Sequence, residues 1–179
     1  AAVGFELYTR MLEEAVAELR GQPIQRPLDP DLTCDVPAYI PDDYVPDTGQ
    51  RLDLYKRLSA VEDEDEVRAL LDEMVDRFGA LSASVLLLAD LMVVKALARR
   101  LCASAVELSE SRLALALRNE TPLSPAQVTK LVSVPKSPWR ITADQRLVRA
   151  WVGIKEREDR LRLAKSLLGD LLSKASGSR

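Results

Sequence analysis

The chain has 179 residues and a formal net charge of −3, with 47% apolar and 30% charged residues. This composition is typical of one globular domain and excludes an intrinsically disordered or collagen-like chain. Histidine is absent and the seven glycines are scattered, so the sequence lacks the usual general base, the commonest metal ligand and any glycine-rich phosphate cradle. We therefore expect no active site, cofactor or metal in this chain.

Charge is distributed unevenly along the chain. Residues 1–90 carry 8 Lys and Arg against 20 Asp and Glu, whereas residues 91–179 carry 17 against 8. This asymmetry has two interpretations: the halves attract each other inside one domain, or each faces a separate partner. The sequence leaves both open.

The cysteines and the longest apolar run indicate where in the cell the protein is expected. Cys34 and Cys102 form no CxxC pattern and are expected to be free thiols in a reducing environment. The chain opens without a basic leader, and the apolar run 85–98 is interrupted by Asp90 and Lys95 and is too short to span a bilayer. We expect a soluble cytoplasmic protein in which this run is a buried helix.

The first predicted element is an amphipathic helix over residues 4–20, ended by Gly21 and Pro23. Six of the ten prolines fall within residues 22–46. Each proline fixes φ and removes an amide donor, so no helix is expected there.

A short strand at residues 32–36 and a stiff segment at residues 38–46 follow in the chain. Apolar side chains anchor the stiff segment, at Tyr39, Ile40, Tyr44 and Val45. The segment is either a rigid cover packed over the core or a contact site that exposes Tyr44 or the pair Asp42 and Asp43.

Two helices with charged outer faces come next. Asp47 and Gln50 fit the capping box that begins the first helix. Three apolar side chains of this helix are expected to face the core: Leu52, Tyr55 and Leu58. Asp63 is the expected N-cap of the second helix, whose first carboxylates lie near the positive end of the helix dipole.

The second helix ends in the stretch Glu73-Met74-Val75-Asp76-Arg77-Phe78-Gly79. Its predicted buried stripe follows helical spacing, at Val67, Leu70, Leu71, Met74, Val75 and Phe78. Gly79 is expected to end the helix in a left-handed conformation. Glu73 and Asp76 lie one turn apart and are expected to point outward together. The neighbouring Arg77 keeps both carboxylates ionised, which is opposite to what a general acid needs.

The second half of the chain changes from helices to short strands. Ser82 caps a helix expected over residues 83–101, and an alternating apolar pattern begins after Cys102. Three short strands are predicted, at 106–108, 112–117 and 139–142, with a polar turn at 109–111 and a short helix at 125–133.

The last predicted element is a long helix. Thr142 and Gln145 fit a capping box, from which the helix is expected to run to about Leu172, followed by a frayed tail over 173–179. Its expected apolar stripe is Leu147, Trp151, Ile154, Leu161, Leu168 and Leu172. The fold class is α+β: a small antiparallel sheet of about three to four short strands, packed with five to six helices that include this long C-terminal one.

Basic side chains gather on this final helix, at Lys155, Arg157, Arg160, Arg162 and Lys165. They suffice for phosphate contacts, but acidic residues are interleaved and no aromatic platform accompanies them. The helix is either an exposed, charge-laced surface or an auxiliary DNA-binding element.

Four motifs in this chain resemble those of a known family. GFELYTRMLEEAV, AYIPDDYV, RLDLYKRL and EMVDRFG stand in the order and spacing found in the C-terminal part of bacterial transcription-repair coupling factors. Six motif positions are Tyr39, Pro41, Tyr44, Tyr55, Phe78 and Gly79. The resemblance implies that residues 1–29 are a linker helix and proline-rich connector from the end of a translocase motor, and that residues 30–179 are the terminal TRCF regulatory domain.

The resemblance also implies a function for the whole protein. Members are ATP-driven DNA translocases that displace stalled RNA polymerase and recruit the repair protein UvrA, using ATP, DNA and polymerase sites outside this region. The terminal domain is expected to be non-catalytic and, in the resting protein, to pack on the UvrB-like N-terminal module and mask its UvrA-binding surface. By this resemblance Glu73 and Asp76, with Arg77 beside them, lie at that contact.

Two features depart from the family pattern. Ala80 and Leu81 stand where a leucine-proline pair is usual, and Cys102 stands where glycine is common, which can alter the turn toward Val106. A purely structural role for the helix end also stays open, with Asp76 and Arg77 capping local backbone groups.

Overall fold

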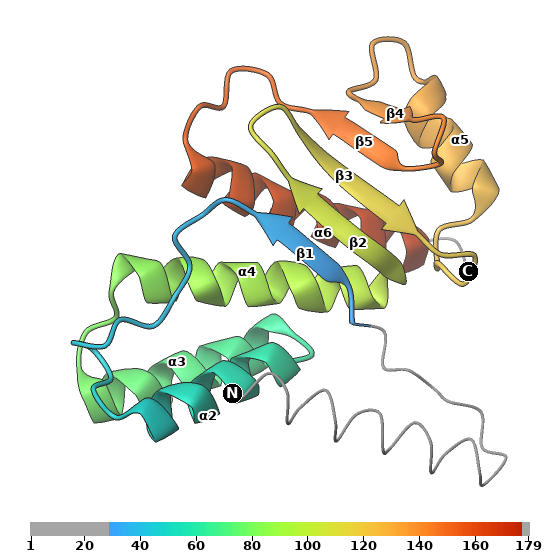
Figure 1. Ribbon diagram of the computed structural model, residues 1–179. Coiled ribbons are helices and arrows are strands. Elements are labelled where there is room, and N and C mark those ends of the chain that lie inside the picture. The colour runs from blue at the N-terminus through green and yellow to red at the C-terminus, as the bar shows by residue number, and fades with distance from the viewer. Residues whose placement is uncertain (1–28, 177–179) are drawn as a thin grey trace, which may run out of the picture.

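The structure, a computed structural model, describes residues 29–176 (Figure 1). The predicted helix at 4–20 and its connector to residue 28 lie outside the described residues. The elements in chain order are β1 (Asp31–Cys34), α2 (Thr48–Ala60), α3 (Glu64–Phe78), α4 (Ala83–Arg100), β2 (Ala103–Leu108), β3 (Arg112–Leu117), α5 (Pro125–Ser133), β4 (Trp139–Ile141), β5 (Leu147–Ala150) and α6 (Arg157–Ser176).

The strands form one mixed sheet in the order β1-β2-β3-β5-β4. β1 is parallel to β2, and every other neighbouring pair is antiparallel, so the expectation of a purely antiparallel sheet is wrong. One row of register partners crosses the whole sheet, through Leu32, Val106, Leu115, Leu147 and Ile141. Since cross-strand partners share a face, this row lies on one side of the sheet. Its buried members join the core cluster that α4 and α6 complete.

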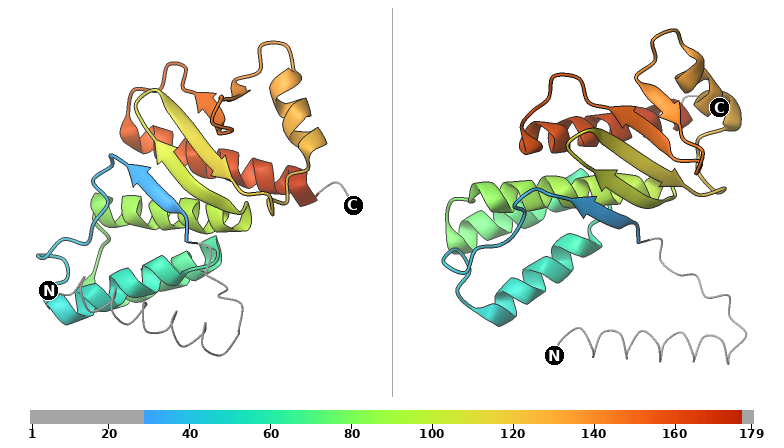
Figure 2. Two further views of the ribbon diagram at one scale, coloured as in Figure 1. Left: turned by 45° about the vertical axis from the view of Figure 1, so that its right-hand side comes forward. Right: turned by 45° about the horizontal axis from the view of Figure 1, so that its top comes forward.

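Helix α4 separates two layers (Figures 1 and 2). The sheet layer consists of the five strands with α5 and α6. The helical layer consists of α2, α3 and residues 38–46, here called the cover segment. Val94 and Ala98 of α4 belong to the sheet-side cluster, whereas Val85 and Leu88 belong to the helical-side cluster. Burial on both sides thus explains why α4 is apolar nearly all round.

The expected α+β class with a long C-terminal helix is confirmed, as are the predicted starts of α2, α3, α4 and α5. The side chains of Asp47 and Asp63 accept hydrogen bonds from the amides of Gln50 and Glu66 at 2.7 and 2.9 Å. Ser124 forms a reciprocal capping box at α5. None of the helices in residues 29–176 combines the length and apolarity that crossing a bilayer requires.

The predicted start of the final helix is wrong. Residues 147–150 form strand β5, and α6 begins only at Arg157. The Thr142 hydroxyl accepts a hydrogen bond from the Arg146 amide at 3.1 Å, and Gln145 adopts a φ of 60°. Thr142 therefore closes a tight turn between β4 and β5, because the same oxygen serves a turn as well as a helix cap. The sheet consequently has one strand more than expected.

Three smaller expectations also fail. Leu52 is 58% exposed, and Leu54 takes its place in the core. Val75 is 42% exposed because α3 lies on the surface and buries only a narrow stripe that includes Met74. The beginning of the predicted frayed tail is helical, since α6 continues to Ser176.

Candidate docking surface at the end of helix α3

The end of α3 is fixed to the cover segment. The Gly79 amide donates to the Val75 carbonyl at 2.9 Å, and Gly79 has the expected positive φ, 87°, although its ψ of −160° lies outside the left-handed helical region. The Tyr44 hydroxyl lies 3.0 Å from the Gly79 carbonyl oxygen and 3.2 Å from that of Met74. The Tyr44 ring also lies 6.0 Å from the Phe78 ring. One tyrosine thus fixes the helix end.

The cover segment packs over the helical core, as the first interpretation proposed. Ile40 and Val45 are buried, and the Ile40 amide donates to the Tyr55 hydroxyl at 2.7 Å. The Val45 amide donates to the Pro41 carbonyl at 3.1 Å, which curls the chain. Exposed side chains also occur on this segment, at Tyr39, Asp42 and Asp43. The segment therefore combines a buried anchor with a polar outer edge.

Glu73 lies between two arginines. Its Oε1 is 2.9 Å from both Arg57 of α2 and Arg77 of α3, and its second oxygen also accepts from Arg57. These hydrogen bonds, from Arg57 first and Arg77 next, lower the pKa of Glu73 to about 2. Arg77 further donates to Gln50 at 3.3 Å and lies 4.9 Å from the Phe78 ring centre. Glu73 consequently links α2 to α3.

Asp76 differs from Glu73. It is exposed, and no ion pair or side-chain hydrogen bond is recorded for it within residues 29–176. The sequence predicted two equivalent outward carboxylates, but the structure gives them different surroundings. Within residues 29–176 Arg77 caps no backbone group, and its side chain donates to Glu73 and Gln50 instead. Arg57, the partner that sequence reasoning missed, gave no signal beyond its outward position on the preceding helix.

The basic residues of the final helix are used largely inside the domain. Arg157 pairs with Asp35, Arg162 with Asp159, and Lys165 with Asp90 at 2.8 Å and Glu64 at 3.2 Å. Arg160 is buried, and Lys155 precedes the helix. Pairing and burial therefore occupy four of these five side chains, while Lys155, Arg157 and Arg162 stay exposed. Asp90, which interrupts the apolar run of α4, accepts a hydrogen bond from Lys165.

These ion pairs support attraction between the two halves of the chain inside one domain. Four basic side chains of residues 91–179 pair with carboxylates of residues 1–90, namely Lys95, Arg99, Arg157 and Lys165. Cys34 and Cys102 are free thiols in the structure. Over the described residues, no group of His, Cys, Asp and Glu side chains is arranged to hold a metal ion.

Fold and site together define an α+β domain that presents a fixed, charged helix end on its helical layer. The chain belongs to the TRCF domain family, whose model matches residues 34–128. It is 39% identical over 171 residues to the transcription-repair-coupling factor of Myxococcus xanthus, covering 96% of this chain and 14% of that protein. The corresponding Escherichia coli protein is 27% identical over 176 residues, with 94% and 15% covered.

A solved structure supports the fold. The crystal structure of the C-terminal domain of transcription-repair coupling factor superposes with a TM-score of 0.73 at 21% identity, covering 84% of this chain and 96% of that one. The chain thus spans about one seventh of the length of these two curated relatives.

Proposed function

We propose that this chain is a non-catalytic regulatory domain of a transcription-repair coupling factor in transcription-coupled DNA repair. It holds the full-length ATP-dependent translocase in an inhibited state by packing on the UvrB-like N-terminal module, where it masks the UvrA-binding surface. The observation that carries the proposal is the α3 end, where the exposed Asp76 stands on a backbone fixed by Tyr44.

Asp76 makes the first contact in this proposal. An exposed carboxylate on a rigid helix end can accept charge-assisted hydrogen bonds from a basic side chain of the module. Because the helix end is already fixed, little conformational entropy is lost when the two surfaces meet. Truncating one partner of such a desolvated charge pair costs roughly 2–5 kcal/mol.

Glu73 acts differently in the same contact. Its carboxylate already accepts from Arg57 and Arg77, so an arginine of the module has to replace one of them. Arg77 is the replaceable one, because Arg57 makes two hydrogen bonds and belongs to the neighbouring helix. Released Arg77 can then meet an acidic group of the module, which makes it a third contact residue.

The test uses the full-length protein that carries this domain. Asp76→Ala and the pair Glu73→Ala with Asp76→Ala are expected to raise UvrA binding in a pull-down, the pair most. Glu62→Ala with Asp65→Ala removes the same charge near the start of α3 and should leave UvrA binding unchanged. If the first pair keeps its fold, by circular dichroism and melting temperature, and UvrA binding does not rise, the assignment of these residues is wrong.

A second variant separates contact from folding. Arg57→Ala keeps the Glu73 carboxylate but removes its link to α2. If Glu73 only joins the helices, Arg57→Ala and Glu73→Ala should lower the melting temperature alike and leave UvrA binding unaffected. If Glu73 is a contact residue, only Glu73→Ala should raise UvrA binding. Reduced hydrogen exchange at residues 73–79 on adding the UvrB-like module would support the contact.

A further inference from the structure

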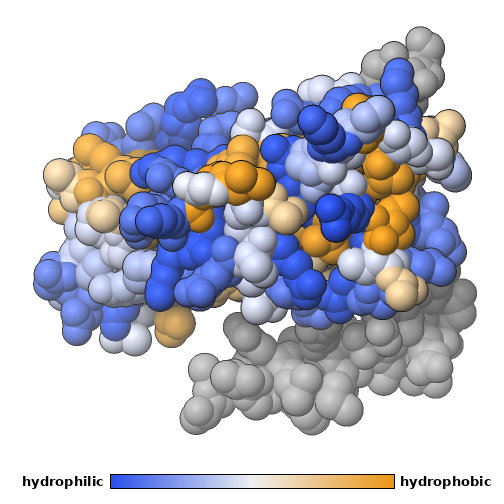
Figure 3. Space-filling view, turned by 90° about the horizontal axis from the view of Figure 1, so that it is seen from above, coloured by the Kyte–Doolittle hydropathy of each residue, from blue (hydrophilic) through white to orange (hydrophobic). Residues whose placement is uncertain are grey.

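Helix α5 covers one edge of the sheet incompletely. It packs against β4, and none of its residues is fully buried. Val128, Leu131 and Val132 are half-buried against the core. Val134, just after the helix, is 54% exposed, and Ile141 of β4 is 51% exposed. Apolar surface shows on the side of the molecule where α5 and β4 lie (Figure 3).

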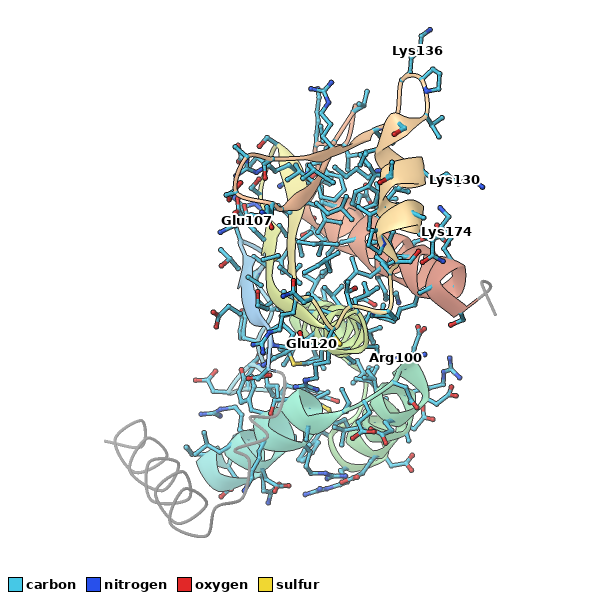
Figure 4. All side chains as sticks on the ribbon, turned by 90° about the vertical axis from the view of Figure 1, so that its right-hand side faces the viewer. Arg100, Glu107, Glu120, Lys130, Lys136 and Lys174 are labelled. Carbon is cyan, nitrogen blue, oxygen red and sulfur yellow. The ribbon has the colours of Figure 1, made fainter. Side chains whose placement is uncertain are left out.

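Three lysines border this surface. Gln127 of α5 donates to the Lys174 backbone carbonyl at 2.7 Å, which places the end of α6 beside the first turn of α5. Lys130 follows Gln127 by three residues and so lies on the same helix face. Lys136 stands in a turn closed by the Ser137 amide and the Val134 carbonyl at 2.8 Å. Figure 4 shows all three lysines along α5.

These three lysines form no ion pair within the described residues, although Asp170 lies one helical turn before Lys174. All three are exposed. Residues 118–143 contain four Lys and Arg but a single acidic residue, Glu120. The other basic residues of α6, in contrast, are paired or buried.

We propose that the surface formed by Lys130, Val134, Lys136, Ile141 and Lys174, here called the α5 face, binds an acidic amphipathic helical segment of another polypeptide. The proposal is independent of the α3 end, which lies in the other layer (Figure 1). All five residues of the α5 face also lie beyond residues 34–128, the range that the family model matches.

The combination of apolar and cationic groups on the α5 face favours an acidic amphipathic helix as its binding partner. A helix whose apolar residues cover Val134 and Ile141 and whose flanking carboxylates reach the lysines satisfies both features at once. Nucleic acid fits less well, because phosphate contacts leave the apolar patch unused. The one aromatic ring within residues 118–143, Trp139, is buried and cannot stack on a base.

The experiment measures fluorescence anisotropy with the 179-residue chain and three labelled probes. The first is a peptide of about 18 leucines and glutamates with the leucines at helical spacing. The second has the same composition in an order without an apolar face, and the third is a DNA duplex of about 20 base pairs. We expect the amphipathic peptide to bind at least roughly tenfold tighter than either other probe.

Variants locate the binding. Lys130→Glu with Lys174→Glu should weaken the amphipathic peptide roughly tenfold, and Val134→Ser a few-fold. Lys56→Glu with Lys155→Glu changes the same charge at two other exposed lysines and should have no such effect. Equal binding of both peptides, equal loss in the control pair, no peptide binding, or tighter DNA binding that the first pair abolishes would each overturn the proposal. Unchanged circular dichroism confirms that every variant is folded.

Discussion

The helical and sheet layers are stabilised in different ways. In the sheet layer, one continuous apolar cluster and the backbone ladders of five strands form the structure. The helical layer has a smaller cluster and depends also on single side-chain hydrogen bonds, from the Ile40 amide to Tyr55, from Tyr44 to α3, and from Arg57 to Glu73. The geometry of its surface is therefore well defined yet sensitive to single substitutions.

A few polar contacts join the layers. Arg99 of α4 donates to the carbonyls of Ser59 and Val61 at the end of α2, at 2.6 and 2.9 Å. Lys165 of α6 reaches Glu64 at the start of α3. These contacts support unfolding of both layers as one unit, which the first prediction tests.

The largest expected effect comes from the two cores. Met74→Ala in the helical layer and Leu115→Ala in the sheet layer should each lower the free energy of unfolding by about 2–5 kcal/mol, because both side chains are fully buried. Both tryptophans, Trp139 and Trp151, lie in or against the sheet-layer core, so their fluorescence reports that layer, whereas far-UV circular dichroism reports both. In urea the two signals should change together. Separate midpoints in Met74→Ala would show that the helical layer opens alone.

Loss of the Tyr44 hydroxyl should have the next largest effect. Tyr44→Phe keeps the ring against Phe78 but leaves the carbonyls of Met74 and Gly79 without this donor. We expect a loss of about 0.5–1.5 kcal/mol in urea unfolding. Tyr39→Phe is the matched control, since Tyr39 is exposed. An equal loss in both variants would remove the special role of Tyr44.

A gain in stability is expected in the sheet layer from Cys102→Gly. Cys102 has a φ of 53°, which costs an L-residue roughly 1–2 kcal/mol, whereas the added flexibility of glycine costs about 0.5–1 kcal/mol. The free energy of unfolding should rise by a few tenths of a kcal/mol to about 1 kcal/mol. Cys102→Ala retains the strained backbone and should show no gain, which separates backbone strain from the thiol.

The smallest expected effect concerns the pH dependence of the helical layer. The pKa of Glu73 is lowered from 4.5 to about 2 by its hydrogen bonds from Arg57 and Arg77. The ionised Glu73 therefore stabilises the fold fully above about pH 4.5, and this contribution is lost as the pH falls toward 2. Glu73→Gln should flatten the melting-temperature profile in that range. About 1 M salt should reduce the difference, since the pair is partly exposed; identical profiles would contradict the assignment.

Local signals in the sequence predicted much of the structure. Side chains such as Asp63 and Ser124 cap helices by contacting amides three residues away, so the pattern is complete within one short stretch. The alternation at 112–117 likewise predicted a strand. The prediction that Thr142 begins the final helix was wrong, because a hydroxyl acceptor satisfies a turn or a helix start equally. The pairing of residues 147–150 with β3 favoured the turn.

The sequence by itself determined the α+β class, the helix caps and the family motifs, because each depends on residues close together in the chain. The absence of histidine follows from composition alone. Only the tertiary structure decided how the charges are used. Glu73 meets an arginine 16 positions away. Arg157 and Lys165 of α6 meet the carboxylates of Asp35, 122 positions away, and Asp90, whereas Asp76 and the lysines of the α5 face stay exposed. Charge interactions act through distance in space, and spacing along the chain does not fix that distance.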